Sequence, residues 1–438
     1  MLPLFHPRRL LQIINSWYRQ PSERTASSWA CINLIIALTQ CHSFGYLDPV
    51  LQIPSVGQCI ENAQSVLTDI LKGNNLELEH VQILLGLGMI FLGRPEPAAP
   101  MVFVSAAMRF AQAMGIHRRD YYDGMAIAPE EATQRRRVFW IAYILDRDVA
   151  LRLRHAPILH DDDMDMDLPP ETMPQSDEDK TDQAGFISVS DDGEGHALTS
   201  FNFFRARIEL AQIESRVYDC VSSVRASRRD PGETAQLAES IRLSIRQWKA
   251  RIPGQLINPT PMLPQADVMH ATYLPRFLCT LSAIVVACLG QLCRVNSMDF
   301  SWIDKVLTYA HSSDAGAVGH IPTPPSQPPG WNALVRESRA FMKLFGSIPL
   351  KHPIFIVTQL GAFASSLLCL SVDLFLNFDD GHCVGDQILK ADAACFLREL
   401  PEENSCYVVE KVLEASRVLE VYSESEWQLR LMTAGLAA

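Results

Sequence analysis

The sequence lacks the short motifs that mark most enzyme families. It contains no Gly-x-Ser-x-Gly elbow, no phosphate loop ending in Gly-Lys-Ser/Thr, no Gly-x-Gly-x-x-Gly and no His-Glu-x-x-His. Gly86 and Gly88 lie inside the apolar stretch 81–92, which is a poor place for a phosphate cradle. Catalytic triads assemble in space, so they leave no mark of this kind. On balance the sequence predicts no catalytic residue, and we expect that the protein is not an enzyme.

Metal-binding patterns are missing as well. The 11 cysteines never stand as Cys-x-x-Cys, the spacing that lets two thiolates share a zinc ion. The acidic run 161–167 does not place Gly and Glu where a calcium loop needs them. His117, His155 and His160 have no spacing that singles them out as ligands. We expect no metal or cofactor in this chain. We also expect free, mostly buried thiols in a reducing compartment, since no signal peptide opens the sequence.

A basic excess, which duplex DNA requires, is absent. The net charge is −12, and residues 161–195 carry all of it, with 13 acidic residues and one lysine. The remainder is neutral, so the chain is expected to bind DNA poorly by itself. Arginines cluster at 118–119, 135–137 and 225–229, where they could assist nuclear import or touch nucleic acid. For 135–137 we favour contacts with the acidic loop or solvent.

Helical spacing of apolar residues recurs along the chain, whereas strand-like alternation is rare. Pro129 suits the first position of the clearest helix, and Glu130 and Glu131 follow where the helix dipole favours them. Gly115 offers a helix stop. Further helices are predicted near residues 29–39, 101–116, 201–224, 233–250, 272–293, 333–345, 354–378 and 405–421. The predicted fold is all-α, a large helical bundle with long acidic and Pro-rich loops, including 320–330.

The apolar run Ile354–Val372 has 19 residues without a charge, which is membrane-spanning length. Gln359 lies within it and Asp373 follows directly, so a helix buried in the protein core is favoured. A membrane-associated helical protein remains the lesser alternative, and we expect no membrane partner.

An ordered set of motifs between residues 106 and 169 resembles a known family. An Ala-rich helix ends in Gly115-Ile116-His117-Arg118, Arg136-Arg137-Val138-Phe139-Trp140 and Asp146-Arg147 follow, and a Pro-led tail closes with Asp161 to Pro169. This order is similar to the middle homology region of fungal zinc-cluster transcription factors, and the stretch 3–38 is similar too. The resemblance covers about residues 3–170. Where the family often carries Gly-Arg-Pro-Pro, this chain has Leu153-Arg154-His155-Ala156-Pro157.

The resemblance implies a regulatory, all-helical region of a nuclear factor that controls metabolic or biosynthetic genes. It implies protein partners, either the transcription machinery or a DNA-binding factor, and a possible small-molecule effector bound among the helices. Family members usually begin with six cysteines that bind two zinc ions and contact DNA. That cluster is absent from this sequence, so zinc and DNA contact are expected only there. Either the sequence is a fragment or shortened gene model, or it is a stand-alone co-regulator that pairs with a DNA-binding factor.

The same resemblance marks a set of structural motif residues: Arg137, Phe139, Trp140, Asp146, Arg147, Pro157, Asp163 and Asp165. Phe139 and Trp140 are expected to anchor their helix in the core. We expect Arg137 and Arg147 to pair with Asp163 or Asp165, which would pin the acidic tail onto the helix. The predicted organisation is a core of the regulatory domain at 1–170, an acidic disordered loop at 171–198, and a C-terminal helical part of the same domain at 199–438.

Overall fold

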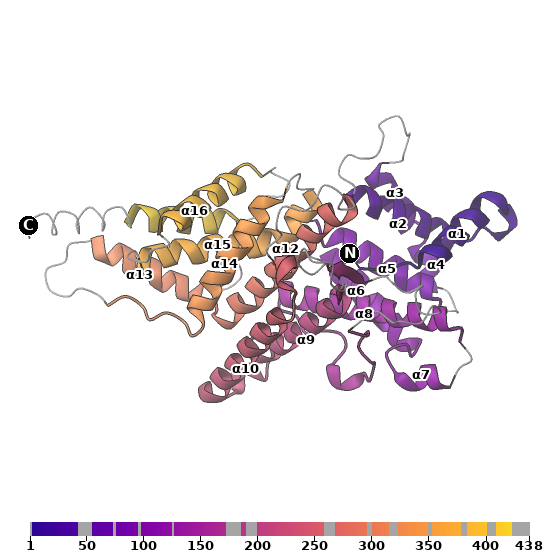
Figure 1. Cartoon of the computed structure of the whole chain (residues 1–438), viewed down its shortest axis with the longest axis horizontal. Coiled ribbons are helices and arrows are strands. Elements are labelled where there is room, and N and C mark those ends of the chain that lie inside the picture. The colour runs from indigo at the N-terminus through magenta and orange to yellow at the C-terminus, as the bar shows by residue number, and fades with distance from the viewer. Residues whose placement is uncertain are drawn as a thin grey trace, which may run out of the picture. The chain divides into compact units, whose positions relative to one another are not determined.

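The computed structural model is almost entirely helical, which confirms the all-α fold class. It describes residues 2–42, 55–72, 76–94, 98–124, 127–171, 185–189, 199–257, 268–295, 300–314, 323–348, 353–377, 383–400 and 409–422. The helices are α1 Pro7–Arg19, α2 Ala26–His42, α3 Val56–Gln64, α4 Leu67–Lys72, α5 Leu78–Phe91, α6 Ala98–Ala113, α7 Arg119–Asp123, α8 Pro129–Leu153, α9 Phe203–Val221, α10 Pro231–Ala250, α11 Gly254–Ile257, α12 Val268–Leu292, α13 Ser301–Asp314, α14 Trp331–Ser347, α15 Pro353–Leu376 and α16 Cys383–Arg398 (Figure 1). Residues 409–422 are also helical.

The chain divides into two compact units. Unit 1 contains Met1–Val224, Leu243–Pro261 and Leu350–Ile356, and unit 2 contains Arg225–Arg242, Met262–Pro349 and Val357–Ala438. The division falls within α10. The predicted ranges 1–170, 171–198 and 199–438 stay a proposal about domain organisation. Most of the predicted acidic loop, 172–184 and 190–198, lies outside the described residues.

Two helix-end signals in the sequence, at Pro129 and Gly115, agree with the structure. α8 begins at Pro129 with Glu130 and Glu131 in its first turn. Gly115 adopts φ +76° just after α6, and the N–H of Ile116 donates to the carbonyl of Ala111, which closes that helix. Such a left-handed residue is accessible to glycine at little cost.

Helix α5 lies at the centre of unit 1 and is buried nearly all round (Figure 1). Ile83 and Leu87 join a core formed with α2, α3 and α4, whereas Leu84 and Leu85 join a second core formed with α6, α8 and α9. Gly86 allows α2 to approach closely, because a Cβ at this position would lie 2.3 Å from Leu34. The Gly86–Gly88 pair therefore serves helix packing.

The N-terminal segment ahead of α1 is fastened to this core. Leu4 is buried, and its carbonyl accepts hydrogen bonds from the side-chain amides of Gln82 on α5 and Gln134 on α8, at 2.6 and 2.8 Å. Burial of two amide groups needs such partners.

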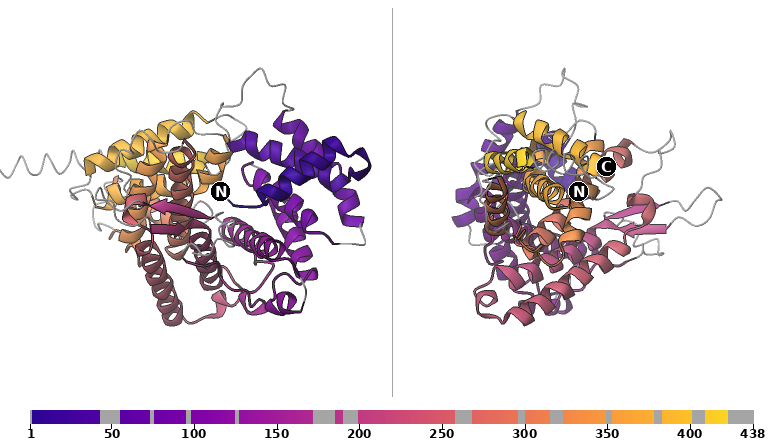
Figure 2. Two further views of the ribbon diagram at one scale, coloured as in Figure 1. Left: turned by 45° about the vertical axis from the view of Figure 1, so that its right-hand side comes forward. Right: turned by 90° about the vertical axis from the view of Figure 1, so that its left-hand side faces the viewer.

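A short hairpin was not predicted. β1 (Phe186–Val189) pairs antiparallel with β2 (Thr199–Asn202), with Phe186 opposite Asn202 (Figure 2). The prediction placed residues 186–189 in a disordered loop and began the next helix at residue 201. α9 instead begins at Phe203, where the Asn202 side chain accepts the N–H of Arg205 as an N-cap.

Unit 2 contains two long apolar helices, α12 and α15, and the amphipathic helix α14, which packs against α12. Windows in α12 and α15, Leu274–Leu292 and Phe355–Leu376, are long and apolar enough to cross a membrane, yet 67% and 61% of their residues are buried inside the protein. Core helices of soluble proteins have this composition too. At the end of α15, Asp373 accepts the Trp331 indole N–H at 2.8 Å and pairs with Arg339 at 3.1 Å. This polar anchorage favours the interpretation of α15 as a core helix.

Candidate functional site

The site is the acidic tail, defined as residues 157–170, and the face of α8 that holds it. The carboxylate of Asp146, on α8, accepts the backbone N–H groups of Ile158 (3.0 Å) and Leu159 (3.4 Å). Its Oδ2 also lies 2.6 Å from Arg147. Burial raises the pKa of Asp146, and Arg147 and the two N–H groups oppose that rise. Asp146 therefore fixes the start of the tail.

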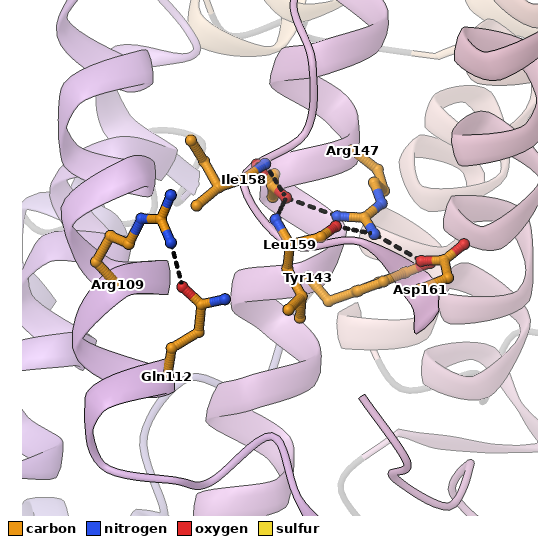
Figure 3. Close-up of polar contacts among 8 residues, drawn as sticks. Arg109, Gln112, Tyr143, Arg147, Ile158, Leu159 and Asp161 are labelled. Carbon is orange, nitrogen blue, oxygen red and sulfur yellow. Dashed lines mark hydrogen bonds and ion pairs between the residues drawn. The ribbon is translucent and has the colours of Figure 1, made fainter. Parts of the chain in front are cut away.

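Arg147 fixes the next turn of the tail. Its side chain is buried, and one guanidinium nitrogen donates both to the Leu159 carbonyl (2.7 Å) and to Asp161 Oδ1 (2.6 Å) (Figure 3). The Tyr143 hydroxyl donates to the same Asp161 oxygen at 2.8 Å. Burial acts to lower the pKa of Arg147, but Tyr143 and the two carboxylates raise it above its usual value. The cation thus stays charged inside the protein.

Arg147 forms ion pairs with aspartates, as predicted, but not with the aspartates that the prediction named. Asp163 and Asp165 were expected to bind it, but the ion pairs go to Asp146 and Asp161. Residues 161–163 form a 3-10 turn, with the Asp163 N–H donating to the His160 carbonyl, and Asp163 is exposed. Asp165 instead accepts the backbone N–H of Arg119 at 2.7 Å. The turn directs Asp161 inward and leaves Asp163 in solvent.

The rest of the tail alternates between the core and solvent. Met164, Met166 and Leu168 pack against the core, while the aspartates between them are exposed. The Trp140 indole N–H donates to the Asp167 carbonyl at 3.2 Å, and Arg119 pairs with the Asp167 carboxylate. The Asp-Met-Asp-Met-Asp sequence is therefore an amphipathic segment whose methionines pack against the core and whose aspartates face solvent.

The end of the tail is held by α9. Asn202 Nδ2 donates to the Pro170 carbonyl at 2.8 Å, and Arg205 donates to the Pro169 carbonyl at 2.6 Å. Sequence reasoning did not identify either residue, since neither belongs to the motif. Their carbonyl partners are prolines that end the tail, and proline carbonyls remain free to accept.

The remaining motif residues lie where the packing argument placed them. Phe139 and Trp140 are fully buried with ring centres 5.2 Å apart, and Pro157 is buried. Arg137 is also buried, and burial lowers its pKa to about 10. Nothing in the structure assigns Arg137 to the tail aspartates, so that pairing stays a prediction.

A second buried ion cluster, which the sequence did not reveal, joins α8 to α9. Arg207 binds Asp148 at 2.6 Å and Glu214 at 2.7 Å. Glu214 is fully buried, and burial raises its pKa to about 8. Arg207 and Glu214 stand seven residues apart on one face of α9, which is the only local sign of the pair.

Arg154 ends α8 in the left-handed conformation, with φ 56° and ψ 32°. Glycine adopts such angles without a steric penalty, whereas arginine does not. The turn therefore forms without the Gly-Arg-Pro-Pro sequence of the family, because Ile158 and Leu159 still reach Asp146.

These residues provide no zinc site. The described part of the chain contains no group of three or more His, Cys, Asp or Glu side chains that could hold a metal ion. The described cysteines are buried apart from Cys395. The charged side chains of Asp146, Arg147 and Asp161 bind each other and backbone groups, an arrangement suited to holding the acidic tail in place.

Comparison with known proteins finds one matching family. Residues 58–250 match the family described as the fungal specific transcription factor domain. The acidic tail and α8 lie within the matched residues, so the match includes the network around Arg147.

Relatives of the chain are fungal regulators. It is 28% identical over 435 residues to the ABC-transporter-regulating transcription factor of Aspergillus oryzae, a match that covers 96% of this chain and 45% of that protein. The protein with the same description in Aspergillus fumigatus is 27% identical over 421 residues, covering 94% and 44%. The fusaridione A cluster transcription factor of Fusarium heterosporum is 26% identical over 274 residues, covering 63% and 49%. The chain spans less than half the length of these curated relatives. No solved structure matches.

Proposed function

We propose that this chain is the regulatory part of a nuclear fungal transcription factor controlling metabolic, transporter or biosynthetic genes. The domain match and the names of the relatives support the regulatory role. The observation that carries the proposal is the acidic tail, which Asp146 and Arg147 hold in the motif order that the family shares. The domain would act through protein partners or a small effector bound among its helices.

The proposal assigns no catalytic centre and no cofactor to this chain. Zinc and DNA contact would belong to a six-cysteine cluster, which is not in this sequence. The neutral body and the acidic residues 161–195 give no attraction for phosphate backbones. Purified chain should therefore not shift duplex DNA at physiological salt.

A reporter experiment tests the regulatory role. The 438-residue chain is fused to a heterologous DNA-binding domain in yeast, and transcription is compared with that of the DNA-binding domain alone. We expect a clear change in reporter transcription, reduced when Arg147→Asp breaks the tail contacts and unchanged with the exposed Asp163→Asn control. A folded, promoter-bound fusion that leaves transcription at the control level would contradict the proposal.

A further inference from the structure

In two of the three arginine clusters, the arginines have partners within unit 1. Arg119 pairs with Asp167, and Arg118 pairs with Asp120. In the second cluster, Arg135 pairs with Glu131, and Arg136 lies 4.5 Å from the centre of the Tyr122 ring. These arginines therefore stabilise the fold and leave little charge for an outside partner.

The third cluster differs from the other two. Residues 222–230 form the turn between α9 and α10, and a 3-10 turn spans Ala226–Arg228. Arg225 and Arg228 are exposed, and neither forms an ion pair with any residue that the structure describes. Arg225 and Arg228 therefore keep their positive charge in solvent.

Three serines lie on or beside this turn, and they differ in how accessible they are to solvent. The Ser222 hydroxyl is buried, and the Ser223 hydroxyl donates to the Asp219 carbonyl at 2.9 Å. Ser227 is exposed, with Arg225 two residues before it and Arg228 and Arg229 directly after it. An enzyme that approaches the turn from solvent therefore reaches Ser227 first.

We propose that Ser227 is a phosphorylation site for a serine/threonine kinase that reads arginines around its target. A kinase with an acidic substrate cleft gains charge-assisted hydrogen bonds from Arg225 and Arg228. In the transfer, the Ser227 Oγ forms a bond to the γ-phosphorus of Mg·ATP while the bond to the β,γ-bridging oxygen breaks. ADP leaves, and the hydroxyl proton passes to the base of the kinase. The inference concerns regulation of this turn and does not depend on the proposed transcriptional role.

The turn is suited to bind the phosphate group that the transfer adds to Ser227. A phosphate carries about −1.5 to −2 charges at neutral pH, so it could pair with Arg225 and Arg228. α10 begins at Pro231, where the Asp230 side chain accepts the N–H of Gly232 at 2.8 Å. Asp230 and Glu233 oppose a new negative charge, but the arginines outnumber them. Phosphorylation would therefore lower the net charge of the turn and give Arg225 and Arg228 an anion to bind.

The test treats the purified full chain with Mg·ATP and the catalytic domain of an arginine-directed kinase of the protein kinase C type. Phosphate is located by mass spectrometry after cleavage with a protease that does not cut at arginine. We expect phosphate on Ser227, loss of that signal in Ser227→Ala, and retention in Ser223→Ala. The initial rate at Ser227 should fall at least about tenfold in Arg225→Gln/Arg228→Gln, because two charge-assisted hydrogen bonds are lost.

Circular dichroism of each variant shows that the chain is folded. An acid-directed kinase of the casein kinase 2 type serves as the matched control and should leave Ser227 unmodified. The proposal is overturned if Ser227 stays unmodified in the folded chain, if the double arginine variant reacts at the wild-type rate, or if the acid-directed kinase modifies Ser227 equally fast.

Discussion

Arg147 lies over the ring of Tyr143, with 4.0 Å between its guanidinium carbon and the ring centre. Both side chains donate to the same oxygen of Asp161. The ring shields the cation from water on one face, and a guanidinium tolerates such a position better than an ammonium does. The network therefore depends on the planar, forked shape of arginine as well as on its charge.

Arg147→Lys should destabilise unit 1 by about 3 kcal/mol or more, because a single ammonium leaves buried carboxylates without their hydrogen bonds. Unfolding in urea, followed by circular dichroism, measures the change. Arg109→Lys is the matched control. Arg109 is exposed on α6 and donates to Gln112 at 3.0 Å, so its replacement should cost less than about 0.5 kcal/mol (Figure 3). Equal effects of the two substitutions would refute a special role for Arg147.

The partner of Arg147 is tested by two neighbouring aspartates. Asp161→Ala removes an acceptor shared by Arg147 and Tyr143, and should lower the free energy of unfolding by about 2 kcal/mol. Asp163→Ala, on the solvent side of the same turn, should change it by less than about 0.5 kcal/mol. The reverse order of effects in the same urea experiment would restore the pairing first expected from the sequence.

Arg154→Gly should stabilise the protein. A non-glycine residue at φ 56° costs about 1–2 kcal/mol, of which glycine recovers part and loses part to its greater freedom when unfolded. We expect a net gain of about 0.5–1 kcal/mol, seen as a higher melting temperature. His155→Gly, one residue further on, should bring no gain, and a loss of stability in Arg154→Gly would show that its side chain matters more than the backbone.

The buried Glu214 predicts how stability changes with pH. Its pKa is raised to about 8 in the folded protein, against about 4.5 when unfolded, so the folded state binds more protons between these values. Its contribution to stability is fully present below pH 4.5 and is lost as pH rises through 8. The free energy of unfolding should therefore carry a falling component between pH 5 and 8, of up to about 1 kcal/mol per pH unit.

Glu214→Gln is the control for this titration, since it keeps the shape of the side chain and removes the ionisable group. The pH dependence should flatten between pH 5 and 8 in this variant. Parallel wild-type and variant curves over that interval would mean that Glu214 does not change protonation there.

Much of the fold could be predicted, because the longest helices are rich in apolar residues at helical spacing. α6, α8 and α15 have apolar residues at spacings of three and four, and their ends carry recognisable residues such as Pro129 and Gly115. The prediction named no helix over α1, α3, α4, α5, α7, α11, α13 or α16. Polar residues interrupt the stripes of α13 and α16, whereas α5 is apolar nearly all round and so shows no stripe. The β1–β2 hairpin was missed because its strands are four residues long and lie beside a polar, acidic stretch.

The site was predicted as a set of residues but not as a set of contacts. Spacing shows that tail aspartates can meet α8, but it does not show the 3-10 turn that selects Asp161 over Asp163. Tyr143 could have been found, because it stands one helical turn before Arg147 and so shares its face. The links to Arg205 and Asn202 join residues more than 30 positions apart, for which local periodicity contains no information.

The double hydrogen bond to the Leu4 carbonyl has a practical consequence for protein engineering. Any tag or foreign module attached ahead of Met1 starts only a few residues from a point that α5 and α8 both hold. A short, stiff connector would therefore fix the orientation of the attached module, whereas a long glycine–serine connector would let that orientation vary. Replacing Gln82 and Gln134 by leucine should loosen this tether and let an attached module rotate freely.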